Sequence, residues 1–520
     1  MRDLKKHNLG KLFLLLLLAL PFAASAQNIW INNEYQKIYD WQDRRNTAEL
    51  KKYFTSKDPK SRELAVLAFA SIQDTGMTND LLKVLYQDKS SNVRLVAIHS
   101  LGQLRNTKLC KQLIAFYAIE KNSDNKATLL EAIGKCADSS AIAFYEAVDI
   151  ESKEIEQAKT LALFYSRGVY FAARKGFVNE TIKSRMDGFQ KNYPQIDFIA
   201  FVNTKIKSGQ NNIAPTRFSK PFKPDIDSAL CMDTLKMIMS PYDKVKFLEK
   251  YEYFTPSSVW YHLAFSKNQN FVSSYALEQY LKSEGFDTAA LYTCFSSGNL
   301  AFIAMAAEKI RKDSLWKDHK NYRIAFLNKV KKLLMMPGEF EAFVELEKTI
   351  CYLQGTVWQY KAPAYNHKIL WHYVEGLKEF EKVKITTTKG TMIMTCTVND
   401  APASVANFLE LVDSGYYNGK YFHRMVPDFV VQGGCPRGDG WGAENWTQRS
   451  ELGLNYIYRQ GSVGLASAGK DSEGVQFFIT HGFTPQLDGR YTIFGEITEG
   501  LEIINLLQIG DQIISIERIK

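Results

Sequence analysis

A helical pattern that repeats every 32 residues is the feature that most limits the fold of this 520-residue chain. Residues 62–72, 94–104 and 126–136 align when each segment is displaced by 32 positions from the one before. In the aligned columns, large apolar residues recur at spacings of three and four with a small residue between them, which suits close packing of a helix against its counterpart in the next repeat. One repeat cannot bury its apolar face alone, so the pattern predicts a stack of helices.

Polar stretches separate these units and supply turn residues and helix caps. The pattern resembles the HEAT-like helical repeats, in a short version that covers about three units. The resemblance implies an N-terminal α-solenoid, which we assign to residues 27–213. Three prolines in a polar stretch predict a linker or crossing loop at 214–228. Amphipathic segments predict a further helical repeat region at 229–380, and a solenoid of this kind suggests a scaffold that holds or positions polypeptide clients.

Residues 1–26 have the form of an export signal. A basic start is followed by an apolar stretch at 12–24, and Ala24, Ser25 and Ala26 supply the small residues of a cleavage site. An uncleaved membrane anchor is the alternative, but the apolar stretch is shorter than the ~20 residues of a span and Pro21 interrupts it. We therefore expect cleavage near Ala26, a mature protein in the periplasm or outside the cell, and no stable membrane span.

Composition and charge argue against several classes of protein. Hydrophobic residues make up 46% and charged residues 23% of the chain, close to the average for soluble globular proteins. The net charge of +9 is mild and no run of lysine and arginine occurs, so nucleic-acid binding is not expected. Seven cysteines stand singly along the chain, which supports neither a disulfide framework nor a metal site.

The hydrophobic period changes near residue 382, where short strand-like segments replace helical ones. Residues 382–520 contain many such segments and two helix candidates, at 401–415 and 501–508. The dipeptide Asn418-Gly419 also predicts a tight hairpin turn. This content predicts a closed antiparallel β-barrel whose ends are covered by two helices. The chain is thus expected to be multidomain, with an α-solenoid followed by a barrel.

Three motifs in the barrel region point to a family. The stretches FHRMVPDFVVQGG (422–434), GSVGLASAGKDSEGVQFFIT (461–480) and LDGRYTIFGEI (487–497) occur in this order. Together they resemble the cyclophilin family of peptidyl-prolyl cis/trans isomerases. The resemblance implies an antiparallel barrel capped by two helices, an active groove on its outer face, and catalysed rotation about X-Pro bonds with no cofactor or metal. It also implies proline-containing polypeptide clients and assistance to protein folding.

The resemblance assigns roles to individual residues. Arg424 is implied to donate a hydrogen bond to the prolyl nitrogen of the twisted amide, and a guanidinium suits this role because it stays charged at physiological pH. Phe429 and Gln432 complete the implied catalytic set, although strict strand alternation would place them on opposite faces. The implied substrate-binding residues are Val426, Val430, Ala466, Ser467, Ala468, Gln476, Phe478, Leu487 and Tyr491.

Three positions depart from the common pattern of the family. Gln486 stands where many members have tryptophan, Tyr491 where histidine is frequent, and Trp441 where a small or hydroxyl residue is common. The first change argues against strong cyclosporin binding, and Trp441 could narrow the groove. The rival interpretation is a non-catalytic protein that binds proline-containing segments, or a holding chaperone with a helical scaffold.

Overall fold

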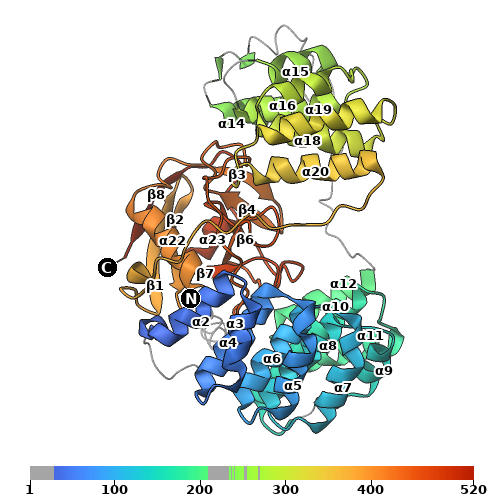
Figure 1. Ribbon diagram of the computed structural model, residues 1–520, viewed down its shortest axis with the longest axis vertical. Coiled ribbons are helices and arrows are strands. Elements are labelled where there is room, and N and C mark those ends of the chain that lie inside the picture. The colour runs from blue at the N-terminus through green and yellow to red at the C-terminus, as the bar shows by residue number, and fades with distance from the viewer. Residues whose placement is uncertain are drawn as a thin grey trace, which may run out of the picture.

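The computed structural model describes residues 28–150, 152–208, 240–250, 255–266 and 270–519, together with residues 234, 235, 237 and 238. Figure 1 shows a β-sheet domain between two groups of helices. We call residues 28–208 the first array, residues 241–354 the second array and residues 380–519 the sheet domain. The predicted export signal at 1–26 and the predicted linker at 214–228 lie outside the described residues.

The first array is a curved stack of paired helices. Its α-helices are α2 (Asn33–Asp43), α3 (Thr47–Lys52), α4 (Pro59–Ile72), α5 (Thr78–Gln87), α6 (Ser91–Gln103), α7 (Cys110–Ile119), α8 (Ser123–Lys135), α9 (Ser140–Ala147), α10 (Ile155–Ala173), α11 (Glu180–Asn192) and α12 (Asp197–Ser208). Short 3-10 turns lie at Ile29–Ile31, Tyr53–Thr55, Thr75–Met77 and Thr107–Leu109.

Packing in the first array follows the 32-residue pattern. The aligned residues Val66, Ile98 and Leu130 on α4, α6 and α8 are completely buried, because each faces the next helix of the stack. Polar contacts repeat in step with them: Arg62 pairs with Asp88 at 2.7 Å, and 32 residues later Arg94 pairs with Glu120 at 2.8 Å. The repeat unit therefore carries its own inter-helix ion pair as well as its apolar face.

The second array is shorter and is followed by an extended segment. Its helices are α14 (Pro241–Lys250), α15 (Ser257–Ala264), α16 (Asn270–Lys282), α17 (Ala290–Ser296), α18 (Leu300–Lys312), α19 (Lys320–Lys332) and α20 (Phe340–Gln354). Residues 355–370, inside the stretch predicted to be helical, contain neither helix nor strand. This segment crosses from α20 to the short helix α21 (Trp371–Val374), which leads into the sheet domain.

The sheet domain contains one antiparallel sheet and two helices. Its elements are β1 (Phe380–Thr387), β2 (Gly390–Thr397), α22 (Pro402–Asp413), β3 (Phe422–Val426), β4 (Val430–Gly433), β5 (Ser462–Leu465), β6 (Phe477–Thr480), β7 (Ile493–Glu499), α23 (Leu501–Ile504) and β8 (Ile513–Arg518). The eight strands are hydrogen-bonded in the order β3-β4-β6-β5-β7-β2-β1-β8. The sheet curls around a core that includes Phe408 of α22, Phe422, Phe477 and Phe494.

The prediction of a closed barrel is wrong, because the sheet is a half-barrel. Its terminal strands β3 and β8 share no ladder and are linked by an isolated bridge between Tyr421 and Gln512 and a few flanking backbone hydrogen bonds. The Asp511 carboxylate explains the gap, because it accepts hydrogen bonds from the backbone N–H of Gln508, at 2.7 Å, and from the Thr388 hydroxyl, at 3.2 Å. These bonds hold a turn where a continuous ladder would need extended backbone.

The predicted hairpin at Asn418-Gly419 is also wrong. These residues lie in a series of turns between α22 and β3, so a helix and not a strand precedes them. The Asn418 side chain accepts a hydrogen bond from the backbone N–H of Ile516 on β8 at 3.1 Å. The asparagine therefore ties the turn to the far edge of the sheet instead of joining two neighbouring strands.

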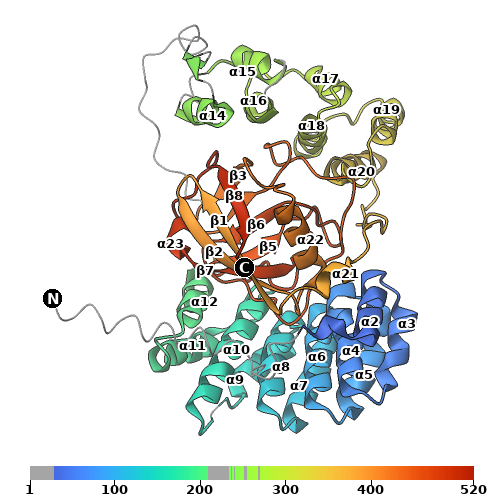
Figure 2. The same ribbon diagram turned by 90° about the vertical axis from the view of Figure 1, so that its left-hand side faces the viewer.

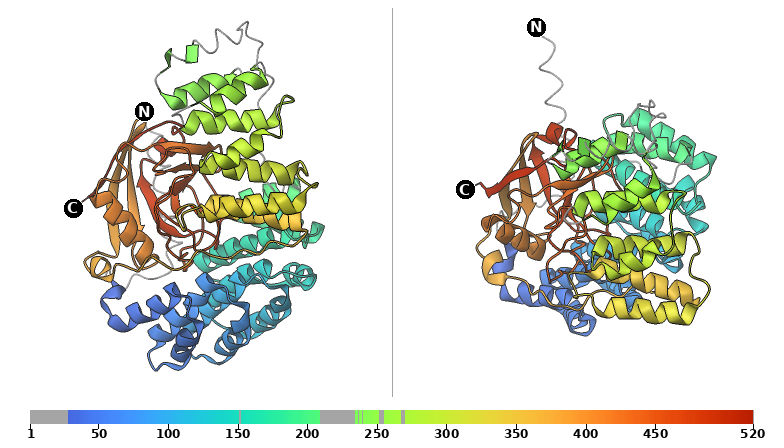
Figure 3. Two further views of the ribbon diagram at one scale, coloured as in Figure 1. Left: turned by 45° about the horizontal axis from the view of Figure 1, so that its top comes forward. Right: turned by 90° about the horizontal axis from the view of Figure 1, so that it is seen from above.

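The two arrays lie on opposite sides of the sheet domain, as Figure 2 shows. The first array and the sheet domain share one continuous hydrophobic core. The second array has a core of its own, against which Trp441 of the sheet domain packs. Seen from above in Figure 3, the second array lies beside the sheet domain. No helix among the described residues has both the length and the apolar character needed to cross a bilayer.

Candidate active site

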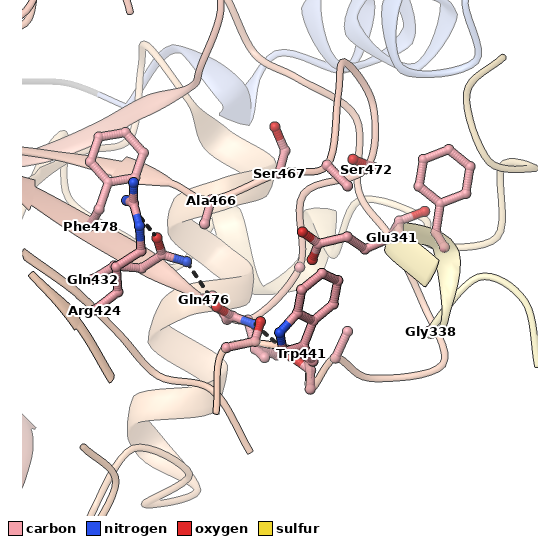
Figure 4. Close-up of a pocket in the computed structure, with 18 of the residues that line it drawn as sticks. Gly338, Glu341, Arg424, Gln432, Trp441, Ala466, Ser467, Ser472, Gln476 and Phe478 are labelled. Atoms are coloured by element: carbon pink, nitrogen blue, oxygen red, sulfur yellow. Dashed lines mark hydrogen bonds between the residues drawn. The ribbon is translucent and has the colours of Figure 1, made fainter. Parts of the chain in front are cut away.

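A cavity of about 580 Å³ opens between the outer face of the sheet and the second array. Strands β3, β4 and β6 supply one wall, and the loops that connect the strands supply the floor and rim. The opposite wall comes from Leu300 at the start of α18 and from residues 337–342 at the start of α20. Figure 4 shows Arg424, Gln432 and Phe478 on one side of this cavity and Glu341 on the other.

Strand register sets the cavity-facing side chains of the sheet in a row. Arg424 on β3 pairs with Gln432 on β4, Gln432 pairs with Phe478 on β6, and Phe478 pairs with Gly464 on β5. Residues directly opposite each other in antiparallel strands point to the same face. Gly464 makes room for the aromatic ring, because a Cβ atom there would lie only 2.7 Å from the Cζ atom of Phe478.

An apolar cluster, separate from the main core, lies beside this row. Its buried members include Val430, Phe478 and Leu487, and Phe429 and Tyr491 pack at its edge. The rings of Phe478 and Tyr491 meet edge to face, with centroids 5.8 Å apart. We call these five residues the apolar notch. Phe429 reaches the notch because it lies in the turn before β4, where strand alternation does not apply.

Polar side chains form a hydrogen-bonded chain that starts at the guanidinium. Arg424 Nη1 donates to Gln432 Oε1 at 3.4 Å, and Gln432 Nε2 donates to Gln476 Oε1 at 2.9 Å. Gln476 Nε2 in turn donates to the carbonyl oxygens of Gly440 and Gly442, at 2.9 and 2.7 Å. The amide of Gln432 is thereby fixed with its oxygen toward the arginine, which orients the guanidinium beside the apolar notch.

The charge state of this group follows from its surroundings. Partial loss of hydration lowers the pKa of Arg424, while Tyr491 and Glu341 act in the opposite direction. A guanidinium nevertheless remains protonated at physiological pH. Burial, and then the neighbouring charge of Arg424, lower the pKa of His423 to about 4, so this histidine is neutral at pH 7. The sheet side of the site thus presents a permanent cation next to a neutral histidine.

The structure brings nearly all the sequence-predicted residues to one cavity. The lining includes Arg424, Phe429, Val430, Gln432, Ala466, Ser467, Ala468, Gln476, Phe478, Leu487 and Tyr491. Val426 does not line the cavity. It pairs with Val430 at the end of β3, two residues beyond Arg424, where the strand runs past the cavity. The catalytic and binding roles of these residues stay predictions.

Sequence reasoning did not find the residues that the second array contributes. Leu300, Phe340 and Glu341 line the cavity, although they precede the sheet domain by many residues and belong to no motif. Trp441 departs from the common cyclophilin pattern, in which a small or hydroxyl residue stands at this position. The structure explains the difference, because the indole packs against the core of the second array. A large apolar residue in an exposed loop was therefore the one available signal of this contact.

The first array supports the cavity from behind. The loop at 484–491 carries Leu487 and Tyr491, and the carboxylate of the intervening Asp488 accepts hydrogen bonds from Arg167 Nη2, at 2.7 Å, and from the backbone N–H of Tyr458, at 2.8 Å. Arg105 Nη2 donates to the carbonyl oxygen of Asp488 at 3.0 Å. The loop that completes the apolar notch is thus held by side chains more than 300 residues away. In the described ranges, no group of three or more histidine, cysteine, aspartate or glutamate side chains is arranged to hold a metal ion.

Comparison with known proteins separates the two kinds of domain. The family model described as cyclophilin type peptidyl-prolyl cis-trans isomerase/CLD matches residues 382–517, and the model described as HEAT repeats matches residues 47–134. The expected order of repeats followed by isomerase domain is confirmed.

Characterised relatives match the sheet domain over most of their own length. A peptidyl-prolyl cis-trans isomerase of Helicobacter pylori is 40% identical over 145 residues, which cover 27% of this chain and 89% of that protein. Peptidyl-prolyl cis-trans isomerase B of Bacillus subtilis is 46% identical over 112 residues, covering 21% and 78%. A relative from Synechococcus elongatus is 42% identical over 135 residues, covering 26% and 92%. The chain therefore belongs to the cyclophilin-type peptidyl-prolyl cis-trans isomerases, and is an isomerase whose catalytic domain follows HEAT repeats.

Proposed function

We propose that this isomerase acts on exported polypeptides and assists their folding, with Arg424, Phe429 and Gln432 as its catalytic residues. One observation carries the proposal: the guanidinium of Arg424 is oriented by Gln432 beside an apolar notch, in a cavity that is open to a peptide. The apolar notch and residues 466–468 bind the substrate, and Val426 borders the notch as the strand partner of Val430 without lining the cavity itself.

Isomerisation needs a hydrogen-bond donor and a site that holds the proline ring, but no nucleophile. Rotation about an X-Pro bond crosses a barrier of about 20 kcal/mol, because the nitrogen lone pair is delocalised into the carbonyl group. In the twisted amide that lone pair is localised and can accept a hydrogen bond. Arg424 donates to it, and Gln432 keeps the guanidinium in place through its own bond to Gln476. The interaction stabilises the transition state more than the planar ground states.

The apolar notch supplies the second part of the catalysis. A single preorganised donor contributes about 3 to 4 kcal/mol, less than the roughly 8 kcal/mol that a millionfold acceleration requires. The rings of Phe429, Phe478 and Tyr491 hold the pyrrolidine ring while the acyl side of the bond turns. The backbone of 466–468 is positioned by the hydrogen bond from Ala466 N–H to the Gln476 carbonyl, at 2.9 Å, and pairs with the peptide.

Cis/trans exchange of a proline peptide, measured by NMR, tests the catalytic roles. Arg424→Ala is expected to lower kcat/KM by about 100- to 1,000-fold, the effect of removing one preorganised donor. Lys382→Ala, which removes an exposed positive charge from β1, is the matched control and should retain wild-type activity. Equal rates in wild type and Arg424→Ala would exclude the assigned role. Peptide binding without any exchange by wild type would favour the rival, a non-catalytic binding protein.

Export and the folding role have separate tests. The form of residues 1–26 supports export, so mature protein from fractionated cells should begin at Gln27 and be found in the periplasmic or extracellular fraction. Protein found only in the cytoplasm with its first residues intact would contradict this. Refolding of a substrate protein limited by proline isomerisation should be faster with wild type than with Arg424→Ala.

A further inference from the structure

The cavity extends beyond the apolar notch into a part with a different character. Past Gln476, its walls include Glu341, Trp441, Ser467 and Ser472, and we call this part the acidic chamber. Figure 4 shows the Glu341 side chain projecting from α20 into the space between Trp441 and the two serines. Residues 466–468 border both the notch and the chamber. A peptide that pairs with this segment runs from one to the other.

Specific contacts hold α20 and its neighbours beside the groove. Gly338, just before α20, approaches the backbone so closely that a Cβ atom there would lie 2.7 Å from the carbonyl oxygen of Glu444. Arg437 Nη2 donates to Asn299 Oδ1 at 3.1 Å, and the Tyr242 hydroxyl donates to the carbonyl oxygen of Gly438 at 2.9 Å. Together with the packing of Trp441, these contacts fix the position of Glu341 relative to the catalytic domain.

Glu341 differs from the other acidic residues around the cavity. The Asp439 carboxylate pairs with Arg437 at 2.9 Å and accepts from the Trp441 N–H at 3.0 Å, and Glu339 Oε2 accepts from the Met335 N–H at 2.8 Å. Glu341 stays exposed to the solvent of the cavity, and no hydrogen bond or ion pair to its carboxylate occurs among the described residues.

The surroundings of Glu341 act on its charge. The surrounding walls of the cavity remove part of the hydration of the Glu341 carboxylate. This loss of hydration, followed by the charge of the neighbouring Glu345, raises the pKa of Glu341 to about 7. A cation that entered the chamber would therefore stabilise the ionised form.

We propose that Glu341 is a specificity-determining residue, which makes the enzyme prefer substrates with a lysine or arginine two or three residues from the proline. The distance in residues follows from the path: an extended peptide advances about 3.3 Å per residue, and the segment 466–468 that it follows is three residues long. The inference rests on the proposed function, because it requires the proline to occupy the apolar notch. It gives the second array a part in substrate selection that the sheet domain cannot supply.

The test uses capped peptides with one proline in an alanine background. Lysine, glutamine or glutamate replaces alanine at each of the three positions before and after the proline, and NMR gives kcat/KM for cis/trans exchange with the full-length protein. At one position on one side of the proline, lysine should raise kcat/KM about fivefold over glutamine, the effect of a partly screened ion pair. Added salt should reduce the difference.

Two variants and a control assign the effect. Glu341→Gln should abolish the lysine preference, so that the lysine and glutamine peptides react at equal rates, and Glu341→Lys should reverse the preference toward glutamate. Glu502→Gln, which removes an exposed charge from α23 outside the cavity, should behave as wild type. Thermal unfolding of each variant checks that the fold is retained. A lysine preference that survives in Glu341→Gln, or the absence of any preference in wild type, would overturn the inference.

A binding measurement separates this inference from the proposed function. Dissociation constants of the same peptides for Arg424→Ala report the preference without catalysis. Tighter binding of the lysine peptide to Arg424→Ala, lost in the double variant with Glu341→Gln, supports the inference even if wild type shows no exchange. Equal affinities for the lysine and glutamine peptides overturn it, whatever the activity.

Discussion

The two helical arrays meet the same catalytic domain in different ways. The first array shares one continuous hydrophobic core with this domain. At their boundary Arg167, only 1% exposed, lies between Glu131 of α8 and Asp488 of the loop at 484–491. The second array keeps a separate core and meets the domain through Trp441 and polar contacts at the rim of the cavity. The first array thus shares the interior of the sheet domain, and the second forms one wall of the cavity.

The difference teaches what each array can contribute. An interface built from a shared core and buried ion pairs holds the two domains in one relative position, because breaking an ion pair leaves a buried charge without its partner. An interface of rim hydrogen bonds and a few ring contacts costs less to alter. Stability should therefore depend mainly on the first array, and substrate choice mainly on the second. Four predictions test this contrast, from the largest expected effect to the smallest.

The strongest effect is expected from Arg167→Met. The change leaves the buried carboxylates of Glu131 and Asp488 without their shared partner, and the free energy of unfolding should fall by about 3 to 5 kcal/mol. Urea unfolding measures it. Arg311→Met in the second array is the matched variant, because its ion pair with Glu345 is partly exposed to solvent. Its loss should be less than half as large. Equal losses would remove the contrast.

A smaller effect is expected from Gly338→Ala at the second interface. The added Cβ atom meets the carbonyl oxygen of Glu444 at 2.7 Å, so α20 has to move, at a cost of about 1 to 3 kcal/mol. Exchange on a neutral proline peptide should stay within about twofold of wild type, whereas the lysine preference should weaken because Glu341 moves with the helix. Gly482→Ala is the control, since a Cβ atom added there would meet no neighbouring atom within 4 Å. Loss of all activity would mean that the second array shapes the apolar notch as well.

The pH dependence of the lysine preference should follow the ionisation of Glu341. With a pKa of about 7, this carboxyl is mostly protonated at pH 6 and mostly ionised at pH 8, so the preference should grow between these values. The other charged groups that face it are Glu345 and Lys348 on its own helix, and Arg424 and Asp439 across the cavity. Glu341→Gln retains all four, so a pH profile that is the same in both proteins would assign the dependence elsewhere.

The smallest change is expected from Tyr242→Phe. The variant loses the hydrogen bond to the Gly438 carbonyl but keeps the ring contact with Tyr421, whose centroid lies 4.7 Å away. The expected cost is about 1 kcal/mol. Hydrogen exchange in α14 measures it as faster local opening, with no change in the sheet domain. A cost above about 3 kcal/mol, read as global unfolding, would mean that the second array is as deeply integrated as the first.

Local sequence patterns predict the parts of this molecule that depend on local physics. The 32-residue pattern leads to the buried column of Val66, Ile98 and Leu130, because each repeat makes the same contact with the next. The three motifs bring Arg424, Gln432 and Phe478 to one cavity, because antiparallel register fixes which side chains share a face. Alternation misplaces Phe429 only because that residue precedes its strand.

Features that depend on the meeting of distant segments escape the same reasoning. Strand content predicts a barrel but does not reveal whether its edges join, and here the carboxylate of Asp511 holds a turn at the seam. Glu341 reaches the cavity through the rigid placement of a whole array, which no spacing in its own neighbourhood records. Asn418 likewise bonds β8 almost 100 residues later instead of closing a local hairpin.

The pairing of Arg167 with Asp488 also has a consequence for how the protein is made. The two residues are 321 positions apart in the sequence. Because a ribosome adds about 5 to 20 residues per second, Asp488 is translated roughly 15 to 60 s after Arg167. During that interval the docking face of the nascent repeats has nothing to cover it. The nascent chain of this enzyme therefore exposes apolar surface for a time, as do the incomplete polypeptides that other folding factors protect.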